Sequence, residues 1–361
     1  MQYYFLLMMV AYLLGNIYIF IRSLQTISTV PTIWKVLFSI LYWIIALGFF
    51  FATMARNMEI PESLSRMLFR AGSSWMVFIL YMVLILAICD IVRLFIPAFK
   101  FGFPLALGVT LALIIYGYWN YRHPDVVNIE VNTGKGLQQP LKVVAISDIH
   151  LGEGTGKSDL KRYVEMINSQ NPDVIIIGGD LIDNSLYPLY RDRMDEELNL
   201  LRAPMGVYMA LGNHDYFSDA DKSAEFIQKT QIRLLRDEVA TLPNGVQIIG
   251  REDRSNRSRS TLAKLAKLVA QTDSTKPIIV IDHQPYDLQK ASAQGVDLQF
   301  SGHTHHGQVW PLNYITDKMF EQSYGLREWG QTTVYVSSGL SLWGPPFRIG
   351  TDSELVVFTI K

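Results

Sequence analysis

Histidine, aspartate and asparagine gather in five short clusters in the C-terminal two-thirds of the chain. Six of the seven histidines lie in these clusters, and only His123 lies outside them. The clusters are Asp148-Ile149-His150, Gly178-Gly179-Asp180, Gly212-Asn213-His214-Asp215, Asp282-His283 and Gly302-His303-Thr304-His305-His306. Imidazole and carboxylate together suit ions such as Mn, Fe or Zn, whereas a soft-metal site would need thiolate. A pair of such ions can activate water and neutralise charge on a phosphoryl group.

The elements that must position these clusters are short strands. Runs rich in β-branched residues predict strands at Leu141–Ser147, Val174–Ile177, Val207–Leu211, Val246–Ile249, Pro277–Ile281, Asp297–Phe300, Thr332–Ser338 and Glu354–Lys361. The stretches between them predict helices at Lys157–Gln170, Tyr190–Leu201, Lys222–Thr230, Thr261–Ala270 and Gln284–Ala293. This alternation predicts an α/β layer structure around a buried sheet. Each cluster follows a predicted strand, and ligand sites of α/β sheets collect at the carboxyl ends of strands.

The ordered series D-x-H, G-D, G-N-H-D, H and G-H-x-H resembles the calcineurin-like metallophosphoesterase superfamily from about residue 141 to the C-terminus. The resemblance implies a two-sheet β-sandwich flanked by helices, with two divalent metal ions at one edge. The implied ligands are Asp148, His150 and His305 for one ion, Asn213, His283 and His303 for the other, and Asp180 as the bridge. His214 would then be the general acid or a hydrogen-bond donor to the transition state, and Asp215 would orient it.

Departures from the family pattern bear on the substrate. Gly179-Asp180 is followed by Leu-Ile-Asp183-Asn184-Ser185, without the arginine of the Ser/Thr protein phosphatases, so that activity is disfavoured. The Gly344–Gly350 segment resembles a membrane-associated branch that includes lipid-sugar nucleotide pyrophosphatases and phosphodiesterases. Arg348 could contact the substrate phosphate or be structural. His306 could contact substrate or be an outward-pointing neighbour of His305, and we favour the latter.

The N-terminal third has a different composition from the remainder. Residues 1–121 contain only ten Asp, Glu, Lys and Arg residues, although mean hydropathy over the whole chain is just +0.17. Four apolar stretches approach the roughly 20 residues that cross a bilayer: Tyr3–Ile21, Thr32–Met54, Ser74–Ile96 and Phe103–Tyr121. We therefore predict a four-helix transmembrane domain at 1–121, a linker at 122–140 and the catalytic domain at 141–361. The alternative, a buried helical bundle, fits four successive runs poorly.

The chain is thus expected to be a multi-pass integral membrane protein, with a bacterial plasma membrane as the expected location. Basic residues on the two sides of the spans number four and five, so their distribution leaves the side of the catalytic domain open. Asp90 and Arg93 lie one helical turn apart near the end of the third stretch, where they could pair or extend toward the interface, and we favour a structural over a functional role. A net charge of −1 gives no reason to expect a nucleic-acid partner.

These features together predict a membrane-anchored phosphoesterase that hydrolyses a phosphodiester or pyrophosphate bond, with lipid-linked or cell-envelope compounds as candidate substrates. The alternative is a metal-binding regulatory or sensor membrane protein without turnover. Two further segments have open interpretations. Trp310, Ile315, Met319 and Phe320 are interpreted as core, with a membrane-facing lip for a lipid tail as the alternative. The polar run Arg251–Ser260 is interpreted as a solvated loop, with contact to an anionic group as the alternative.

Overall fold

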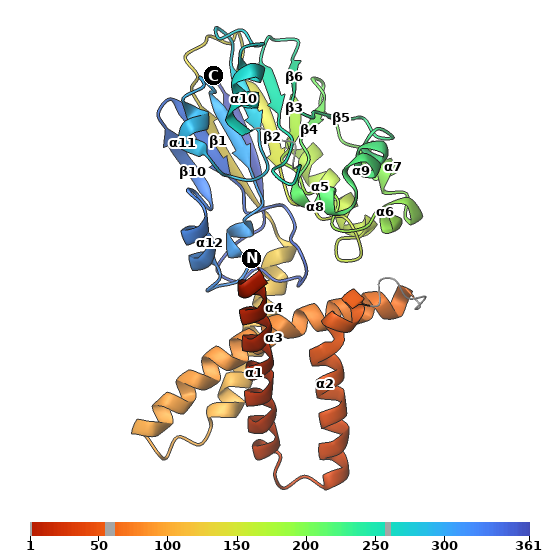
Figure 1. Cartoon of the computed structure of the whole chain (residues 1–361), viewed down its shortest axis with the longest axis vertical. Helices are drawn as coiled ribbons and strands as arrows, with labels where there is room; N and C mark the ends of the chain where they lie inside the picture. Colours follow the sequence, from red (N-terminus) through yellow and green to blue (C-terminus); the bar gives the residue numbers. More distant parts are fainter. Residues whose placement is uncertain (1, 55–61, 257–260) are drawn as a thin grey trace. The chain divides into compact units, whose positions relative to one another are not determined.

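The computed structural model describes residues 2–54, 62–256 and 261–361 of the chain (Figure 1). The chain divides into two compact units. One consists of Met1–Trp119 with Gly344–Phe347, and the other of Asn120–Trp343 with Arg348–Lys361. The first unit is helical, and the second contains all of the strands in the described part of the chain.

The helices of the N-terminal third are α1 (Gln2–Thr26), α2 (Thr32–Met54), α3 (Glu62–Phe95) and α4 (Gly102–Arg122). By length and composition, the segments Leu6–Thr26, Met67–Phe95 and Gly102–Arg122 could each cross a membrane. The apolar part of α2 found by the same criterion is shorter, Thr32–Gly48. Three of the four expected spans thus meet the criterion, and a span at α2 stays a prediction.

Several polar side chains of this unit are paired between helices, and such partners offset the cost of burying polar groups. The Tyr18 hydroxyl donates to Asp90 Oδ2 at 2.5 Å, and Arg22 forms an ion pair with the same oxygen. Asp90 of α3 is therefore paired with Arg22 of α1, which agrees with a structural role for this charge. The Trp75 indole donates to Asn16 Oδ1 at 2.9 Å and ties α3 to α1 at a second point.

Two six-stranded sheets form the second unit. In spatial order, the first contains β1 (Asp125–Val131), β12 (Glu354–Ile360), β2 (Leu141–Ile146), β3 (Val174–Ile177), β4 (Val207–Met209) and β5 (Ile232–Leu234). The second contains β10 (Gly325–Trp329), β11 (Thr332–Val336), β9 (Leu298–Ser301), β8 (Ile278–Ile281), β7 (Gln247–Gly250) and β6 (Glu238–Thr241). Strands β2 to β5 are mutually parallel, as are β7, β8, β9 and β11.

Short helices follow many of the strands. They are α5 (Lys157–Ser169), α6 (Tyr187–Arg191), α7 (Met194–Leu198), α8 (Asn213–Phe217), α9 (Ala220–Ile227), α10 (Thr261–Val269), α11 (Leu288–Ser292), the 3-10 turn η2 (His305–Gly307) and α12 (Asn313–Met319). Figure 1 shows α5 and α9 beside the first sheet and α10 and α11 beside the second.

Alternating side chains of the strands build two separate apolar layers, because successive residues of a strand point to opposite faces. Val143 of β2 packs with Phe300 of β9 in the layer between the sheets. Val144, its neighbour, packs with Tyr163 of α5 on the outer face of the first sheet. Each fully buried side chain of this size contributes about 1.5–3 kcal/mol. This arrangement confirms the predicted sandwich of two sheets flanked by helices.

The secondary structure differs from our expectation in several places. The helix expected at Tyr190–Leu201 is split into α6 and α7, because Arg193 adopts φ 50° and interrupts the helical backbone. The range 122–140, expected to be a linker, contains β1, which pairs in parallel with β12. The short strands β5, β6 and β10 were not predicted; with three to five residues each, they show little periodicity.

Two expectations about burial are also corrected. The run Arg251–Ser260 is not wholly a solvated loop: Arg251 is buried and pairs with Asp282 at 3.0 Å, while residues 257–260 lie outside the described chain. The core interpretation of the residues after the last cluster is wrong for Trp310, Ile315 and Met319, which are exposed. Phe320 is half-buried.

Candidate metal centre

The seven predicted metal ligands all follow strand ends. Asp148 and His150 come after β2, Asp180 after β3, Asn213 after β4, His283 after β8, and His303 and His305 after β9. Because β2, β3 and β4 are parallel neighbours, the loops that follow them leave the same edge of the first sheet. The same holds for β8 and β9 in the second sheet. Packing the two sheets face to face brings the two sets of loops together.

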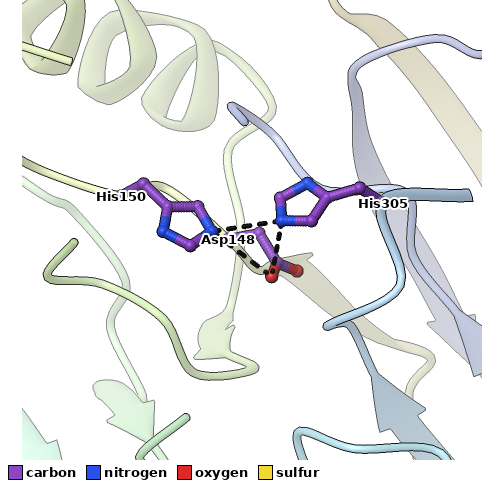
Figure 2. Close-up of side chains that lie close together, drawn as sticks. All are labelled: Asp148, His150 and His305. Carbon is purple, nitrogen blue, oxygen red and sulfur yellow. Dashed lines mark hydrogen bonds and ion pairs between the residues drawn. The ribbon is translucent and has the colours of Figure 1, made fainter. Parts of the chain in front are cut away.

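Asp148, His150 and His305 form one group of candidate ligands, which combines residues from both sheets (Figure 2). The Nε2 atoms of His150 and His305 lie 3.1 Å apart. Asp148 Oδ1 lies 3.7 Å from His150 Nε2 and 3.4 Å from His305 Nε2. Figure 2 shows the two rings turned toward each other with the carboxylate beside them. Three such atoms within 4.8 Å of one another could share a metal ion.

A second group contains Asp180, His283 and His303. Asp180 Oδ2 lies 3.1 Å from His283 Nε2, and the side-chain oxygen of Asn213 lies 3.1 Å from the same nitrogen. His283 Nδ1 lies 2.7 Å from the carbonyl oxygen of Gly178. Since a carbonyl only accepts, Nδ1 must donate, which leaves Nε2 as the ring atom available to a metal.

Asp180 lies between the two groups. Its Oδ2 is 3.1 Å from His283 Nε2 in the second group and 3.8 Å from His150 Nε2 in the first. Its other oxygen, Oδ1, accepts the backbone N–H of His214 at 2.7 Å, which fixes the carboxylate. Asp180 is therefore in the position that a bridging ligand would need.

Two glycines make the turns after the strands possible. A Cβ added to Gly212 would lie 2.2 Å from Asp180 Oδ1, and one added to Gly302 would lie 2.2 Å from Asp148 Oδ2. Neither distance is compatible with a side chain. These positions must therefore be glycine for the carboxylates to sit where they do.

Charge in the site is balanced between buried acids and imidazoles. Burial would raise the pKa of Asp148, but the neighbouring His305 and His150 hold it well below its usual value. Burial lowers the pKa of His303 to about 4, with a further contribution from His283. Burial also holds the pKa of His305 well below its usual value. The carboxylate of Asp148 is thus ionised, which is the form that binds metals. Burial would lower the pKa of His150, but its contacts with Asp148 and Asp183 raise it to about 10, so this ring must release a proton to bind a metal.

His214 is placed beside this centre, but its partner is not the one we expected. Its Nδ1 lies 3.1 Å from Asp183 Oδ1 and 2.9 Å from the Asp183 carbonyl oxygen. Asp215 instead accepts the backbone N–H groups of Ile182 at 2.9 Å and Gly212 at 2.8 Å. In this geometry Asp183, and not Asp215, contacts the His214 ring. The only sequence signal for Asp183 was its place three residues after Asp180.

Burial also affects Asp215. Its side chain is fully enclosed, and burial, followed by the negative charge of Asp180, raises the pKa of Asp215 to about 7. The two backbone hydrogen bonds oppose this rise. Asp215 is thus a structural anchor for the loops after β3 and β4.

Arg348 is buried and its guanidinium is occupied by protein acceptors. Nη1 donates to the His305 carbonyl at 2.8 Å, and Nη2 donates to the carbonyls of Ser338 at 2.5 Å and Ser341 at 2.6 Å. This geometry favours the structural alternative over contact with a substrate phosphate. Arg348 acts on the site through the backbone of His305.

His306 does not point into either ligand group. Its ring stacks on Tyr324 with centroids 4.5 Å apart and an interplanar angle of 12°. The backbone of His306, which follows the candidate ligand His305, has a positive φ of 47°. The interpretation of His306 as an outward-pointing neighbour of His305 fits this placement.

The residues present fit divalent ions. Asp148 and Asp180 are almost fully buried. Among the residues the structure describes, their ion-pair partners are His150, His283 and His305, with no Lys or Arg within ion-pair distance. Buried carboxylates are costly unless they are paired or coordinate a metal. The mixture of imidazole, carboxylate and amide oxygen suits Mn, Fe or Zn.

Comparison with known proteins agrees with this site. The calcineurin-like phosphoesterase family matches residues 141–307. An uncharacterised metallophosphoesterase of Campylobacter jejuni is 31% identical over 264 residues, covering 72% of this chain and 70% of that protein. A Danio rerio transmembrane protein with a metallophosphoesterase domain is 33% identical over 275 residues, covering 71% of this chain and 62% of that protein. The chain therefore belongs to the calcineurin-like metallophosphoesterases, hydrolases that act on phosphoester bonds.

Proposed function

We propose that this protein is a membrane-anchored phosphoesterase that uses two divalent metal ions to hydrolyse a phosphodiester or pyrophosphate bond. The observation that carries the proposal is the position of Asp180, whose Oδ2 lies 3.8 Å from His150 Nε2 and 3.1 Å from His283 Nε2. One buried carboxylate thus touches two groups of candidate ligands. This arrangement suits two ions held a short distance apart.

Each ion has its own set of residues. One would be held by Asp148, His150 and His305, the other by Asn213, His283 and His303, and both by Asp180. When bound, two such ions lower the pKa of a water molecule and offset charge that develops on the phosphoryl oxygens. The candidate ions are Mn, Fe and Zn, and metal analysis of the purified protein would identify them.

The protein supplies proton transfer through His214. The Nδ1–H group of His214 donates a hydrogen bond to Asp183, which fixes the ring. Nε2 is then free to donate a proton or a hydrogen bond to the leaving oxygen. Asp183 also stabilises positive charge on the ring through its own negative charge. We therefore assign His214 as the general acid and Asp183 as its positioning residue.

The proposed substrate follows from the anchor. Three helices have the length and composition of membrane spans, and a relative is named as a transmembrane protein. We include α2 as a fourth span and propose that the protein lies in a bacterial plasma membrane. Residues 1–121 would be the anchor, 122–140 the connection and 141–361 the catalytic domain. An anchor keeps the site near the bilayer, where phosphodiester and pyrophosphate lipids and cell-envelope intermediates are available. The absence of arginine after Asp183 disfavours phosphoproteins.

The test uses the full chain in detergent with bis-p-nitrophenyl phosphate and p-nitrophenyl phosphate, before and after chelation and after return of Mn²⁺. We expect metal-dependent turnover that favours the diester, and near-complete loss in Asp180→Asn. Asp221→Asn, which changes an exposed carboxylate in the same way, is the matched control. A folded, metal-loaded chain that cleaves neither compound nor a pyrophosphate lipid would support the alternative, a metal-binding regulatory or sensor protein.

A further inference from the structure

Large apolar side chains are exposed on the segment that follows the last metal-site loop. We call this the α12 surface; it consists of Trp310, Leu312, Tyr314, Ile315 and Met319. Their exposed fractions run from 38% for Leu312 to 61% for Met319, and α12 has no buried residue. Single exposed apolar residues are common, but five of them between Trp310 and Met319 are typical of an interaction surface.

The α12 surface is rigidly attached to the metal-site loop. The turn η2 contains His305 and packs directly against the start of α12. A Cβ added to Gly307 would lie 2.3 Å from the backbone nitrogen of Asn313, so the two backbones are in close contact. Leu312 N–H also donates to the Val309 carbonyl at 2.9 Å. Whatever the α12 surface contacts therefore lies close to a candidate metal ligand.

The same surface is connected to the end of a candidate membrane span. Trp310 N–H donates to the Ile349 carbonyl at 2.7 Å. Two residues further, the Thr351 carbonyl accepts from the side chain of Asn120 at 3.0 Å, and the Arg348 carbonyl accepts from it at 3.3 Å. Asn120 lies in the last turn of α4, the apolar helix Gly102–Arg122. Asn120, Thr351 and Trp310 all belong to the second unit, so the segment that positions Trp310 is hydrogen-bonded to the residue that directly follows the first unit in the chain.

We propose that the α12 surface inserts into the interface of the lipid bilayer. Its side chains are those that favour this environment, since Trp and Tyr prefer the headgroup level and Leu, Ile and Met the acyl boundary. Lipid is the expected occupant because this segment is hydrogen-bonded to Asn120, one of the last residues of the candidate span Gly102–Arg122. The docked surface would hold His305 at the level of lipid headgroups. The inference rests on the proposed membrane anchor but not on phosphoester hydrolysis.

The experiment places a fluorescent label at single cysteines of the full chain. The one native cysteine, Cys89, is first replaced by alanine. Labels are then attached at Ile315→Cys in the α12 surface, at Leu111→Cys in α4 and at Leu200→Cys, a similarly exposed leucine after α7. Each protein is reconstituted into phosphatidylcholine and phosphatidylglycerol vesicles with or without nitroxide-labelled lipid. Aqueous iodide quenching is measured on the same samples.

We expect nitroxide lipid to quench the labels at 315 and 111 several-fold more than the label at 200, with the 315 label shielded from iodide. If nitroxide lipid quenches the label at 111 but quenches the label at 315 no more than the label at 200, lipid docking is overturned and the anchor remains intact. A 315 label shielded from both quenchers would show a protein contact such as a second copy, which also overturns it. An unquenched label at 111 would overturn the anchor together with this inference.

Discussion

At the scale of single residues, the two aspartates near His214 separate into different roles. Asp183 contacts the His214 ring, whereas Asp215 accepts two backbone N–H groups in a fully buried position. A change at the first should therefore affect proton transfer, and a change at the second should affect folding. The resemblance to the family implied the orienting role for Asp215, which is adjacent to His214 in the motif.

Asp183→Asn should lower kcat about 10- to 100-fold, since a positioned acid contributes up to about 10²–10⁴-fold and the ring itself remains. The melting temperature should stay near that of the wild type, and metal affinity should fall modestly, because Asp183 Oδ1 also lies 3.6 Å from Nδ1 of the candidate ligand His150. Asp215→Asn should lower the stability by about 1–3 kcal/mol, because it weakens two buried hydrogen bonds. Turnover, metal analysis and thermal unfolding of the full chain check both. A kcat for Asp183→Asn within twofold of wild type would refute its positioning role.

Arg348 provides a second prediction at this scale. Arg348→Lys keeps a positive charge but cannot reach the carbonyls of His305, Ser338 and Ser341 together. Leaving buried acceptors unpaired costs about 1–3 kcal/mol each, so we expect a lower melting temperature and weaker metal binding. The KM for a soluble diester should change little. A normal melting temperature with a large rise in KM would instead indicate direct contact with the substrate phosphate.

At the scale of elements, the tight turns after the strands determine where the carboxylates lie. Gly302→Ala places a methyl group against Asp148, where a Cβ would be 2.2 Å from Oδ2. We expect this variant to fold and to lose metal affinity at least tenfold, because its ligand must move. Gly154→Ala is the matched control, since a Cβ there meets nothing within 4 Å. Equal metal affinity in the two variants would contradict the role of the Gly302 turn.

The α12 surface makes a prediction about substrates. Ile315→Ser combined with Met319→Ser should lower the hydrolysis of a phosphodiester embedded in vesicles several-fold and leave that of bis-p-nitrophenyl phosphate unchanged. The physical reason is the loss of apolar contact with lipid, while every candidate metal ligand is left unchanged. Leu326→Ser, at an equally exposed position on β10, serves as the control. Equal losses on both substrates would argue that the double change disturbs the metal site instead.

Element prediction succeeded where the pattern was strong and failed where tertiary contacts decide. The buried strands β3 and β8 are continuous apolar runs and β2 is apolar except at Lys142, and each is followed by its predicted cluster. The strand β1 lies at the edge of its sheet and has several exposed residues, so the sequence of 122–140 resembles a linker. The positive φ of Arg193, which divides a predicted helix, has no marker such as glycine in the sequence.

At the scale of the whole molecule, uneven composition predicted the division into an apolar helical part and an α/β part. The convergence of the clusters could be predicted from strand order, because parallel strands end at one edge. The sequence could not, however, predict which residues face outward. Trp310, Ile315 and Met319 have the composition of a core segment, and only the fold shows that α12 lies on the surface. The number of spans also depends on α2, whose apolar segment is short.

The central claim is that Asp180 joins two metal ions in one catalytic site. The most direct measurement is the metal content per chain of the purified full-length protein, titrated with Mn²⁺ alongside turnover of bis-p-nitrophenyl phosphate. We predict that activity rises as a second ion binds and that Asp180→Asn binds fewer ions and loses turnover. Full activity with a single ion per chain, or unchanged activity in Asp180→Asn, would contradict the claim.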